Sequence, residues 1–346
     1  MGSGGFGYPY SLGVGQAFFA LPSATVKDAF EHTIKRLELD PTRLRQAEQH
    51  FGTIKSLIEE ALPGSRVDPI GSFGHGTMIR PANVGKVDAD FGDDWEHAYT
   101  PIDIDAIVVL GSSIPQAEPG RMVTVDDLLS DVRKALVSDL TYKQMQPRRD
   151  RPAITLTFSD EFSVELVPAL IDMTNMQVAQ RAHPVYLVAS EEGGWKWADY
   201  DHDSAYLLTL NRSVGGWLLP AIRLCKGFVR SRGLPFSSFH VTLICATFLP
   251  GFVQDCTVSG IALDYRHLLW SFLKTLPTIL RSPLLLPGSL TPSYRMAEED
   301  AKKAQQPCTL YANAVDSLLS APDSDSGIKL WRQFYGHPFP SPQAIK

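Results

Sequence analysis

The sequence has few cysteines, no long apolar run and no excess of positive charge, and each absence excludes a class of protein. The four cysteines among 346 residues show neither a CxxC pair nor zinc-finger spacing, so we expect reduced thiols without a metal role. No run of 18 apolar residues is present, so no membrane span is expected. The net charge of −6 argues against a binder of duplex nucleic acid, which needs a basic surface.

Two short segments have an unusual composition without indicating a function. The run QPRRDR at 146–151 is basic, and a short run of this kind is typical of a solvated turn. The opening residues MGSGGFGYPY lack the basic and apolar regions of a secretory signal. We expect residues 1–20 to form a flexible leader.

The apolar periodicity divides the chain into a mixed first half and a helical second half. Helical patterns alternate with short apolar strands up to about residue 180, and strands are predicted at RVDPI, at PIDIDAIVVLG and in the hairpin AITLTF–FSVELVPAL. Residues 82–100 are polar and acidic without a clear period, and are predicted to form a loop. The pattern gives an α+β fold with a leader (1–20), an α+β domain with N-terminal helices (21–195), a helical lobe (196–336) and an extended tail (337–346).

Two aspartates lie one residue apart in the predicted strand PIDIDAIVVLG. Side chains of a strand alternate between its faces, so Asp103 and Asp105 project to the same side, with Cα atoms roughly 6.5–7 Å apart. Ile102 and Ile104 point the other way, into a core. Two carboxylates this close repel each other unless a cation lies between them. Oxygen ligands in this pattern suit Mg²⁺, which binds through a few carboxylates together with waters and substrate phosphates.

A third carboxylate would complete a two-metal site. Glu165 is the best candidate, because it is a lone acid on the apolar strand FSVELVPAL. If this strand pairs beside the Asp103 strand, three carboxylates converge and two metals could promote the displacement of pyrophosphate. Asp172 in ALIDM is the fallback for the third acid.

The stretch GSFGHGT, from Gly71 to Thr77, has almost no side chain to pack. Glycines let backbone N–H groups approach phosphate oxygens closely, and a following helix would direct its positive end at the same anion. Ser72 adds a hydroxyl. The spacing differs from that of an ATPase P-loop, and most isolated GSxxxGT patterns are turns. The ordered set of GS, GT, a DxD strand, a hairpin and a lone acid is much more specific than any of its parts.

This ordered set resembles the DNA polymerase β-like nucleotidyltransferases. The resemblance extends to the bacterial cGAS/DncV-like nucleotidyltransferases, the CD-NTases, over about residues 20–340, and is carried by IDIDAIVVL, ELVPAL, AIRLCKGFVRSRGLPFSSFHVTLI and IKLWRQFYGHPFP. It implies a bilobed enzyme in which a nucleotidyltransferase sheet domain and a C-terminal helical domain flank a central active-site cleft. It also implies two Mg²⁺ ions, with Mn²⁺ as a substitute, bound by Asp103, Asp105 and Glu165.

The resemblance assigns further residues to nucleotide binding. Gly71 and Ser72 would contact the triphosphate of the donor nucleotide, and Lys226 matches a helical-lobe lysine that meets the same triphosphate. Without the resemblance, Lys226 would be interpreted as a surface lysine whose apolar stem packs on the protein while its ammonium group stays in water. Either Ser237 or Ser238 matches an assisting serine, and the sequence does not distinguish between them. The family's third acid is often Asp, whereas here it is Glu.

Several functions are compatible with this resemblance. The main hypothesis is a synthase in the bacterial cytoplasm that makes cyclic di- or trinucleotides from NTPs, releases pyrophosphate and acts in anti-phage (CBASS) signalling. The alternatives are a linear oligonucleotide synthase, a transferase that nucleotidylylates a protein or small molecule, and a catalytically silent nucleotide-binding or antitoxin module. A regulatory protein partner fits the family. The absence of a zinc-binding insertion and the acidic charge argue against activation by DNA.

Four other conspicuous side chains are expected to be structural. His75 reads as a solvent-facing turn residue, and His240 as a structural residue of a mostly apolar helix. Trp195 and Trp197, spaced by one residue, are typical of a loop anchor.

Overall fold

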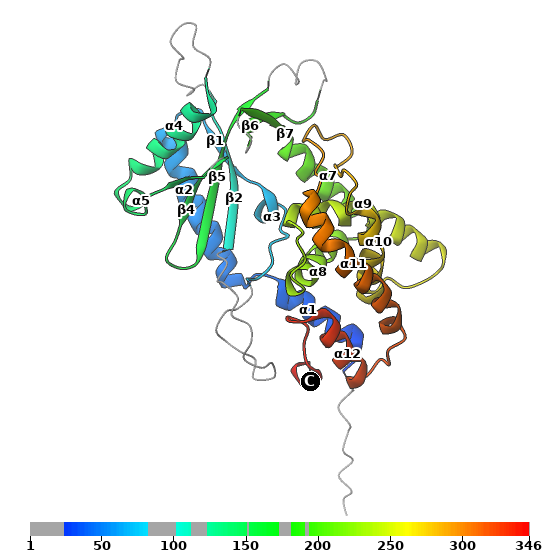
Figure 1. Cartoon of the computed structure of the whole chain (residues 1–346). Coiled ribbons are helices and arrows are strands. Elements are labelled where there is room, and N and C mark those ends of the chain that lie inside the picture. The colour runs from blue at the N-terminus through cyan, green and yellow to red at the C-terminus, as the bar shows by residue number, and fades with distance from the viewer. Residues whose placement is uncertain are drawn as a thin grey trace, which may run out of the picture.

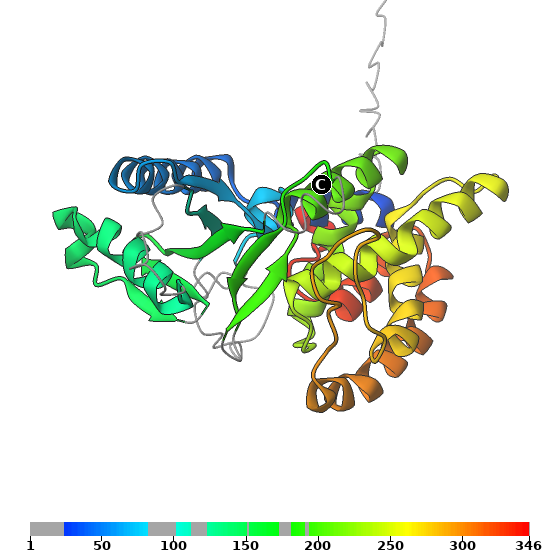
Figure 2. The ribbon, with the colours of Figure 1, turned by 90° about the horizontal axis from the view of Figure 1, so that it is seen from above.

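A computed structural model describes residues 24–81, 102–111, 123–150, 152–172, 181–190 and 194–345 of the chain. Within these ranges, a domain built on a mixed seven-stranded sheet lies beside a lobe made of helices (Figure 1). Seen from above, the two parts lie side by side (Figure 2). The predicted α+β architecture is therefore confirmed.

The sheet has the order β1-β2-β5-β4-β3, and β6 also pairs with β5 and with β7. Strands β2 and β5 are parallel neighbours, and every other pairing is antiparallel. The strands are β1 (Arg66–Pro69), β2 (Ile102–Val109), β3 (Arg148–Asp150), β4 (Ala153–Thr157), β5 (Phe162–Ile171), β6 (Tyr186–Ala189) and β7 (Trp195–Ala198).

The strands predicted from alternation are present as β1, β2, β4 and β5, and three further strands within the described ranges, β3, β6 and β7, lie where none was expected. The basic run forms β3, at one edge of the sheet, rather than a turn. Trp195 and Trp197 lie in β7 rather than in a loop. The predicted loop at 82–100 lies outside the described residues.

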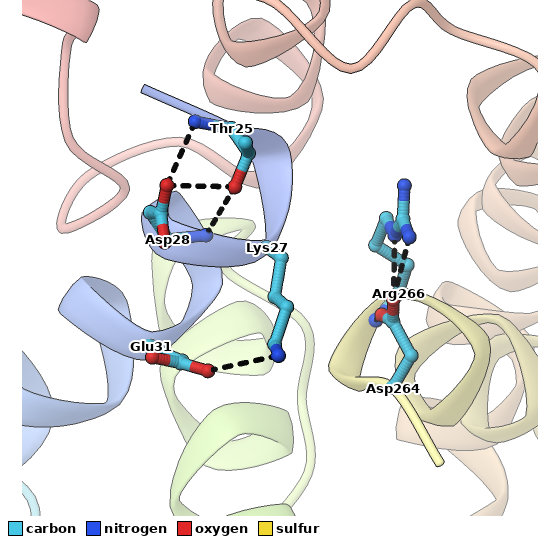
Figure 3. Close-up of polar contacts among 6 residues, drawn as sticks. All are labelled: Thr25, Lys27, Asp28, Glu31, Asp264 and Arg266. Carbon is cyan, nitrogen blue, oxygen red and sulfur yellow. Dashed lines mark hydrogen bonds and ion pairs between the residues drawn. The ribbon is translucent and has the colours of Figure 1, made fainter. Parts of the chain in front are cut away.

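Four of the five helices described before residue 150, all except α3, begin at residues whose side chains cap their first turns. Thr25 and Asp28 form a capping box at the start of α1 (Val26–Leu37), in which the Thr25 side chain accepts from the Asp28 N–H and the Asp28 carboxylate accepts from the Thr25 N–H (Figure 3). Asp40 caps α2 (Pro41–Ala61), with Pro41 at its first position, as the sequence predicts. The other helices of this part of the chain are α3 (Gly71–Gly74), α4 (Val125–Val137) and α5 (Leu140–Gln144).

One face of the sheet is covered by helices and the other carries the acids. Ile54 of α2 and Leu128 of α4 pack in one core with inward-facing strand residues such as Ile104, Ile154 and Leu166. Because strand side chains alternate, the residues between these positions project from the opposite face. We call that opposite face, which carries Asp103, Asp105 and Glu165, the acid face.

The helical lobe also includes elements from both ends of the described chain. Its helices are α7 (Tyr200–Ser213), α8 (Leu218–Ser231), α9 (Ser238–Val258), α10 (Tyr265–Ile279), α11 (Glu298–Leu319) and α12 (Asp325–Tyr335). Phe30 of α1 packs edge-on against Trp331 of α12 and against Phe339, with ring centroids 5.0 Å apart in both pairs. The segment after α12 is thus buried on α1, and its end forms a short 3₁₀ turn at Pro342–Ala344.

One helix within the described ranges, α9, is long and apolar enough to cross a membrane by length and composition alone. Its buried residues, including Leu243, Ile244 and Leu249, belong to the core of the helical lobe. Packing inside that lobe accounts for its apolar composition.

Candidate active site

The three predicted acids lie on one face because of the register between β2 and β5. Asp105 is directly opposite Glu165, and Asp103 is directly opposite Ser163, two residues earlier on each strand. Paired residues of neighbouring strands project to the same face, and neighbouring strands lie about 4.8 Å apart. The structure therefore brings Asp103, Asp105 and Glu165 together, as predicted from two separate strands of the sequence.

Burial raises the pKa values of all three acids, and repulsion from neighbouring acids adds to the shift at Asp105 and Glu165. Burial raises the pKa of Asp105 to about 7, with Glu165 and then Asp103 adding to the effect and Lys226 opposing it. Burial, followed by repulsion from Asp103 and Asp150, raises the pKa of Glu165. Burial also raises the pKa of Asp103. Negative charge on these carboxylates is thus unfavourable without a cation beside them.

Gly71 lies directly against one of the acids. It has a φ of +59°, and a Cβ at this position would lie 2.5 Å from Oδ2 of Asp105. The neighbouring Ile70 N–H donates to the Asp105 carbonyl at 2.9 Å. Helix α3 begins at Gly71 itself, with only four residues, rather than after the glycine segment as expected. The glycine allows the turn to approach β2 as closely as it does.

We expect Gly71→Ala to impair both folding and activity. An alanine at position 71 would have to adopt a left-handed backbone conformation, and its methyl group would displace the Asp105 carboxylate. A loss of about 1–3 kcal/mol in stability is therefore expected. Gly52→Ala in α2 is the matched control, since nothing lies within 4 Å of its Cβ position and alanine favours helix. Thermal unfolding of the two variants measures the difference. Equal midpoints would contradict the close approach.

The helical lobe holds the glycine segment through α8. The Lys226 Nζ donates to the carbonyl and Oγ1 of Thr77, both at 3.3 Å, and Arg223 Nη2 donates to the Gly76 carbonyl at 2.8 Å. Lys226 is 5% exposed, so the reading of it as a surface lysine is wrong. Burial lowers its pKa to about 8, and Asp105 is among the groups that oppose this shift. Lys226 therefore lies close to both the glycine segment and the acids.

The contacts of His75 and His240 are structural. His75 is not a solvent-facing residue: its Nε2 lies 2.9 Å from Ser204 Oγ of α7, and burial lowers its pKa to about 4. His240 is fully buried in α9, as expected, with its ring near Phe236 and Tyr294. His75 thus links the glycine segment to the helical lobe.

Comparison with known protein families identifies the family to which the chain belongs. A family profile described as the Second Messenger Oligonucleotide or Dinucleotide Synthetase domain (SMODS) matches residues 24–199, about half of the chain. The chain belongs to this family. The resemblance to CD-NTases is thereby confirmed, and this synthetase is a nucleotidyltransferase. No curated protein matches the chain.

Solved structures share the fold over nearly the whole length. CdnC of E. coli MS115-1 with ATP is 18% identical, with a TM-score of 0.64 over 92% of this chain and 99% of that one. Vibrio cholerae DncV, a cyclic AMP-GMP synthase, with a linear intermediate is 12% identical, with a TM-score of 0.64 over 93% and 98%. CdnG of Bradyrhizobium diazoefficiens with GTP is 13% identical, with a TM-score of 0.63 over 94% and 97%.

The acids of the synthetase fit a divalent cation by their chemistry. Among the residues that the structure describes, no three His, Cys, Asp or Glu side chains are already placed to share one ion. Mg²⁺ does not need such a cage, because it keeps several waters and binds through one or two carboxylates plus substrate phosphates. The paired, desolvated carboxylates of Asp105 and Glu165 match that requirement.

The other predicted residues of the synthetase are less closely tied to the acids. Ser72 is half-buried in α3. Ser237 caps α9 by accepting from the His240 N–H at 3.1 Å, and Ser238 is exposed at the next position. The fallback acid Asp172 follows the end of β5, roughly 20 Å along the strand from Glu165, so it does not compete for the third position.

Sequence reasoning missed two residues that hold this site together. Thr77 was noted only as part of the GT pair, although its carbonyl and hydroxyl both accept from Lys226. Arg223 lies one helical turn before Lys226 in α8, and that spacing is the only sign in the sequence that both side chains share a face.

Proposed function

We propose that this synthetase is a Mg²⁺-dependent enzyme that joins NTPs through phosphodiester bonds, releases pyrophosphate and closes the product into a cyclic di- or trinucleotide. The observation that carries the proposal is the register of β2 and β5, which sets Asp105 beside Glu165 and next to Gly71. Such a set of acids beside a glycine turn suits phosphoryl transfer, in which positioning and charge stabilisation do most of the work.

Asp103, Asp105 and Glu165 would hold two Mg²⁺ ions, with Mn²⁺ as a substitute. When bound, the ions would supply Lewis-acid activation of the attacking ribose hydroxyl and stabilise the leaving pyrophosphate. The three carboxylates would themselves bind and orient these ions, since their raised pKa values favour any partner that offsets their charge.

The donor triphosphate would lie beside the glycine segment, within reach of Lys226 of α8. Gly71 lets the turn pass close to the Asp105 carboxylate, which would bring a phosphate held by the turn near the acids, and Ser72 offers a hydroxyl. The Lys226 ammonium, held by Thr77, would offset the charge that develops on the departing pyrophosphate. Ser237 or Ser238 would assist at the start of α9.

The biological role belongs to the same proposal. We place the enzyme in the bacterial cytoplasm as the signal generator of an anti-phage (CBASS) system. The E. coli CdnC has been solved in complex with a HORMA protein, which supports a regulatory protein partner for this chain. The acidic net charge supports activation by a cue other than DNA.

Product analysis tests the proposal. The protein is incubated with all four NTPs and Mg²⁺ or Mn²⁺, at neutral and alkaline pH, and pyrophosphate and nucleotide products are measured. We expect a product that resists phosphatase, because a closed ring has no terminal phosphate. A phosphatase-sensitive oligomer would instead favour the linear synthase, and nucleotide attached to another molecule would favour the nucleotidylylating alternative. No pyrophosphate under any condition would contradict the proposal.

A further inference from the structure

The basic run at 146–151 is the sequence feature that the proposed function leaves unexplained. Its two central arginines project to opposite faces of β3. Arg149 forms an ion pair with Asp126 of α4, the helix that covers the core face. Arg148, one residue earlier, therefore projects from the acid face.

The register connects Arg148 to the acids in one row across the sheet. Arg148 is opposite Thr155, Thr155 is opposite Glu165, and Glu165 is opposite Asp105. Directly paired residues share a face, so all four side chains project from the acid face. Two strand spacings separate the Cα atoms of Arg148 and Glu165 by roughly 10 Å.

Among the described residues, one polar group of this row has no hydrogen-bond partner and another has no ion pair. Thr155 is 9% exposed, and its Oγ1 is buried without a hydrogen-bond partner. Arg148 forms no ion pair in the described part of the chain, and its Nη2 donates only to Thr157 Oγ1, at 3.4 Å. Thr157 and Asp150 lie on opposite sides of the Arg148–Thr155 pair, so the guanidinium leans away from the Asp150 carboxylate. A buried hydroxyl without a partner and a guanidinium without an ion pair in the described part of the chain together suit a phosphate.

The row lies on the far side of the acids from the proposed donor site. Gly71 and Lys226 lie at the β2 side, whereas β4 and β3 continue from β5 in the other direction. In phosphoryl transfer the attacking and leaving oxygens lie roughly in line on opposite sides of the phosphorus. A pyrophosphate that leaves toward Lys226 therefore requires the attacking nucleotide on the β4–β3 side.

We propose that Arg148 and Thr155 bind the 5′-polyphosphate of the attacking nucleotide, so that the outer strands β3 and β4 form the acceptor side of the site. This inference rests on the proposed function. It assigns a role to the basic run, and it makes the enzyme select an acceptor by the charge at its 5′ end as well as by its base.

Separate donor and acceptor analogues test this assignment. A 2′,3′-dideoxynucleoside triphosphate has no ribose hydroxyl and can serve only as donor. An α,β-methylene nucleoside triphosphate cannot lose pyrophosphate and can serve only as acceptor. Each joining event then forms one phosphodiester bond, from the acceptor hydroxyl to the donor α-phosphorus, and releases one pyrophosphate. The reaction is run with every base combination, and with nucleoside 5′-monophosphates as a second acceptor series.

We expect Arg148→Ala to raise the KM for the methylene triphosphate acceptor about tenfold, which is the effect of one lost charge-assisted contact. The KM for the monophosphate acceptor and for the donor should stay unchanged. Thr155→Val, which keeps the shape of the side chain, should raise the same acceptor KM. Arg149→Ala is the matched control on the opposite face and should leave all three constants unchanged.

The outcomes separate this inference from the function on which it rests. If the wild-type protein joins nucleotides and Arg148→Ala has the wild-type acceptor KM, the acceptor assignment is wrong and the proposed function stands. An equal rise in donor and acceptor KM would also refute the assignment. If the wild-type protein joins no pair of analogues and no natural NTPs, both are refuted.

Discussion

Replacing both aspartates of β2 by asparagine, Asp103→Asn with Asp105→Asn, is expected to reduce nucleotide joining by roughly a thousandfold or more while the fold stays intact. Metal-assisted charge stabilisation contributes several kcal/mol to such transfers, and each 1.36 kcal/mol is a factor of ten in rate. Pyrophosphate release under single-turnover conditions measures the loss. Activity within tenfold of the wild type would contradict the assignment of these acids.

The same substitution should stabilise the metal-free protein at neutral and alkaline pH. Folding raises the pKa of Asp105 from 3.8 to about 7, so the folded state binds this proton more tightly than the unfolded state. Stability is therefore lost as pH rises from about 4 to about 7, and Asp105→Asn removes a penalty on the order of 4 kcal/mol at pH 8. Thermal unfolding in a chelator at pH 5 and pH 8 measures this. A variant with the same pH dependence as the wild type would refute the raised pKa of Asp105.

Lys226→Met is expected to reduce kcat by roughly a hundredfold or more with a smaller change in KM. The buried ammonium acts most strongly on the charge that develops as pyrophosphate leaves, so its loss falls mainly on the chemical step. Methionine keeps the apolar stem but leaves the buried Thr77 carbonyl and hydroxyl without their donor, so a loss of about 1–3 kcal/mol in stability is also expected. Lys302→Met in α11 is the control, since that lysine is exposed beside Glu298. A variant that changes only KM would place Lys226 in ground-state binding instead.

The sequence predicted the centre of the sheet because that centre depends on local alternation. Asp103 and Asp105 are separated by apolar residues that must face a core, and Glu165 is the lone acid on an apolar strand. These patterns assigned the three acids to one side of their strands. Their actual proximity depends on the parallel pairing of β2 with β5, which the sequence allowed without requiring.

Features that depend on contacts between distant segments could not be predicted. The burial of Lys226 depends on Thr77, which is far away in sequence, and the contact of His75 depends on Ser204 of α7. Strands β3 and β7 have only three and four residues, too few for alternation to identify them. These two segments form strands because they pair with β4 and β6. Tertiary contacts, rather than local composition, therefore determine their secondary structure.

Binding of Mn²⁺, followed by the loss of the free-ion signal in electron paramagnetic resonance, tests the central claim most directly. A non-hydrolysable NTP is present, and the wild-type protein is compared with the double variant Asp103→Asn, Asp105→Asn. We predict that the wild-type protein sequesters about two Mn²⁺ ions per chain and that the variant sequesters far fewer. Equal Mn²⁺ binding by the two proteins would contradict the account.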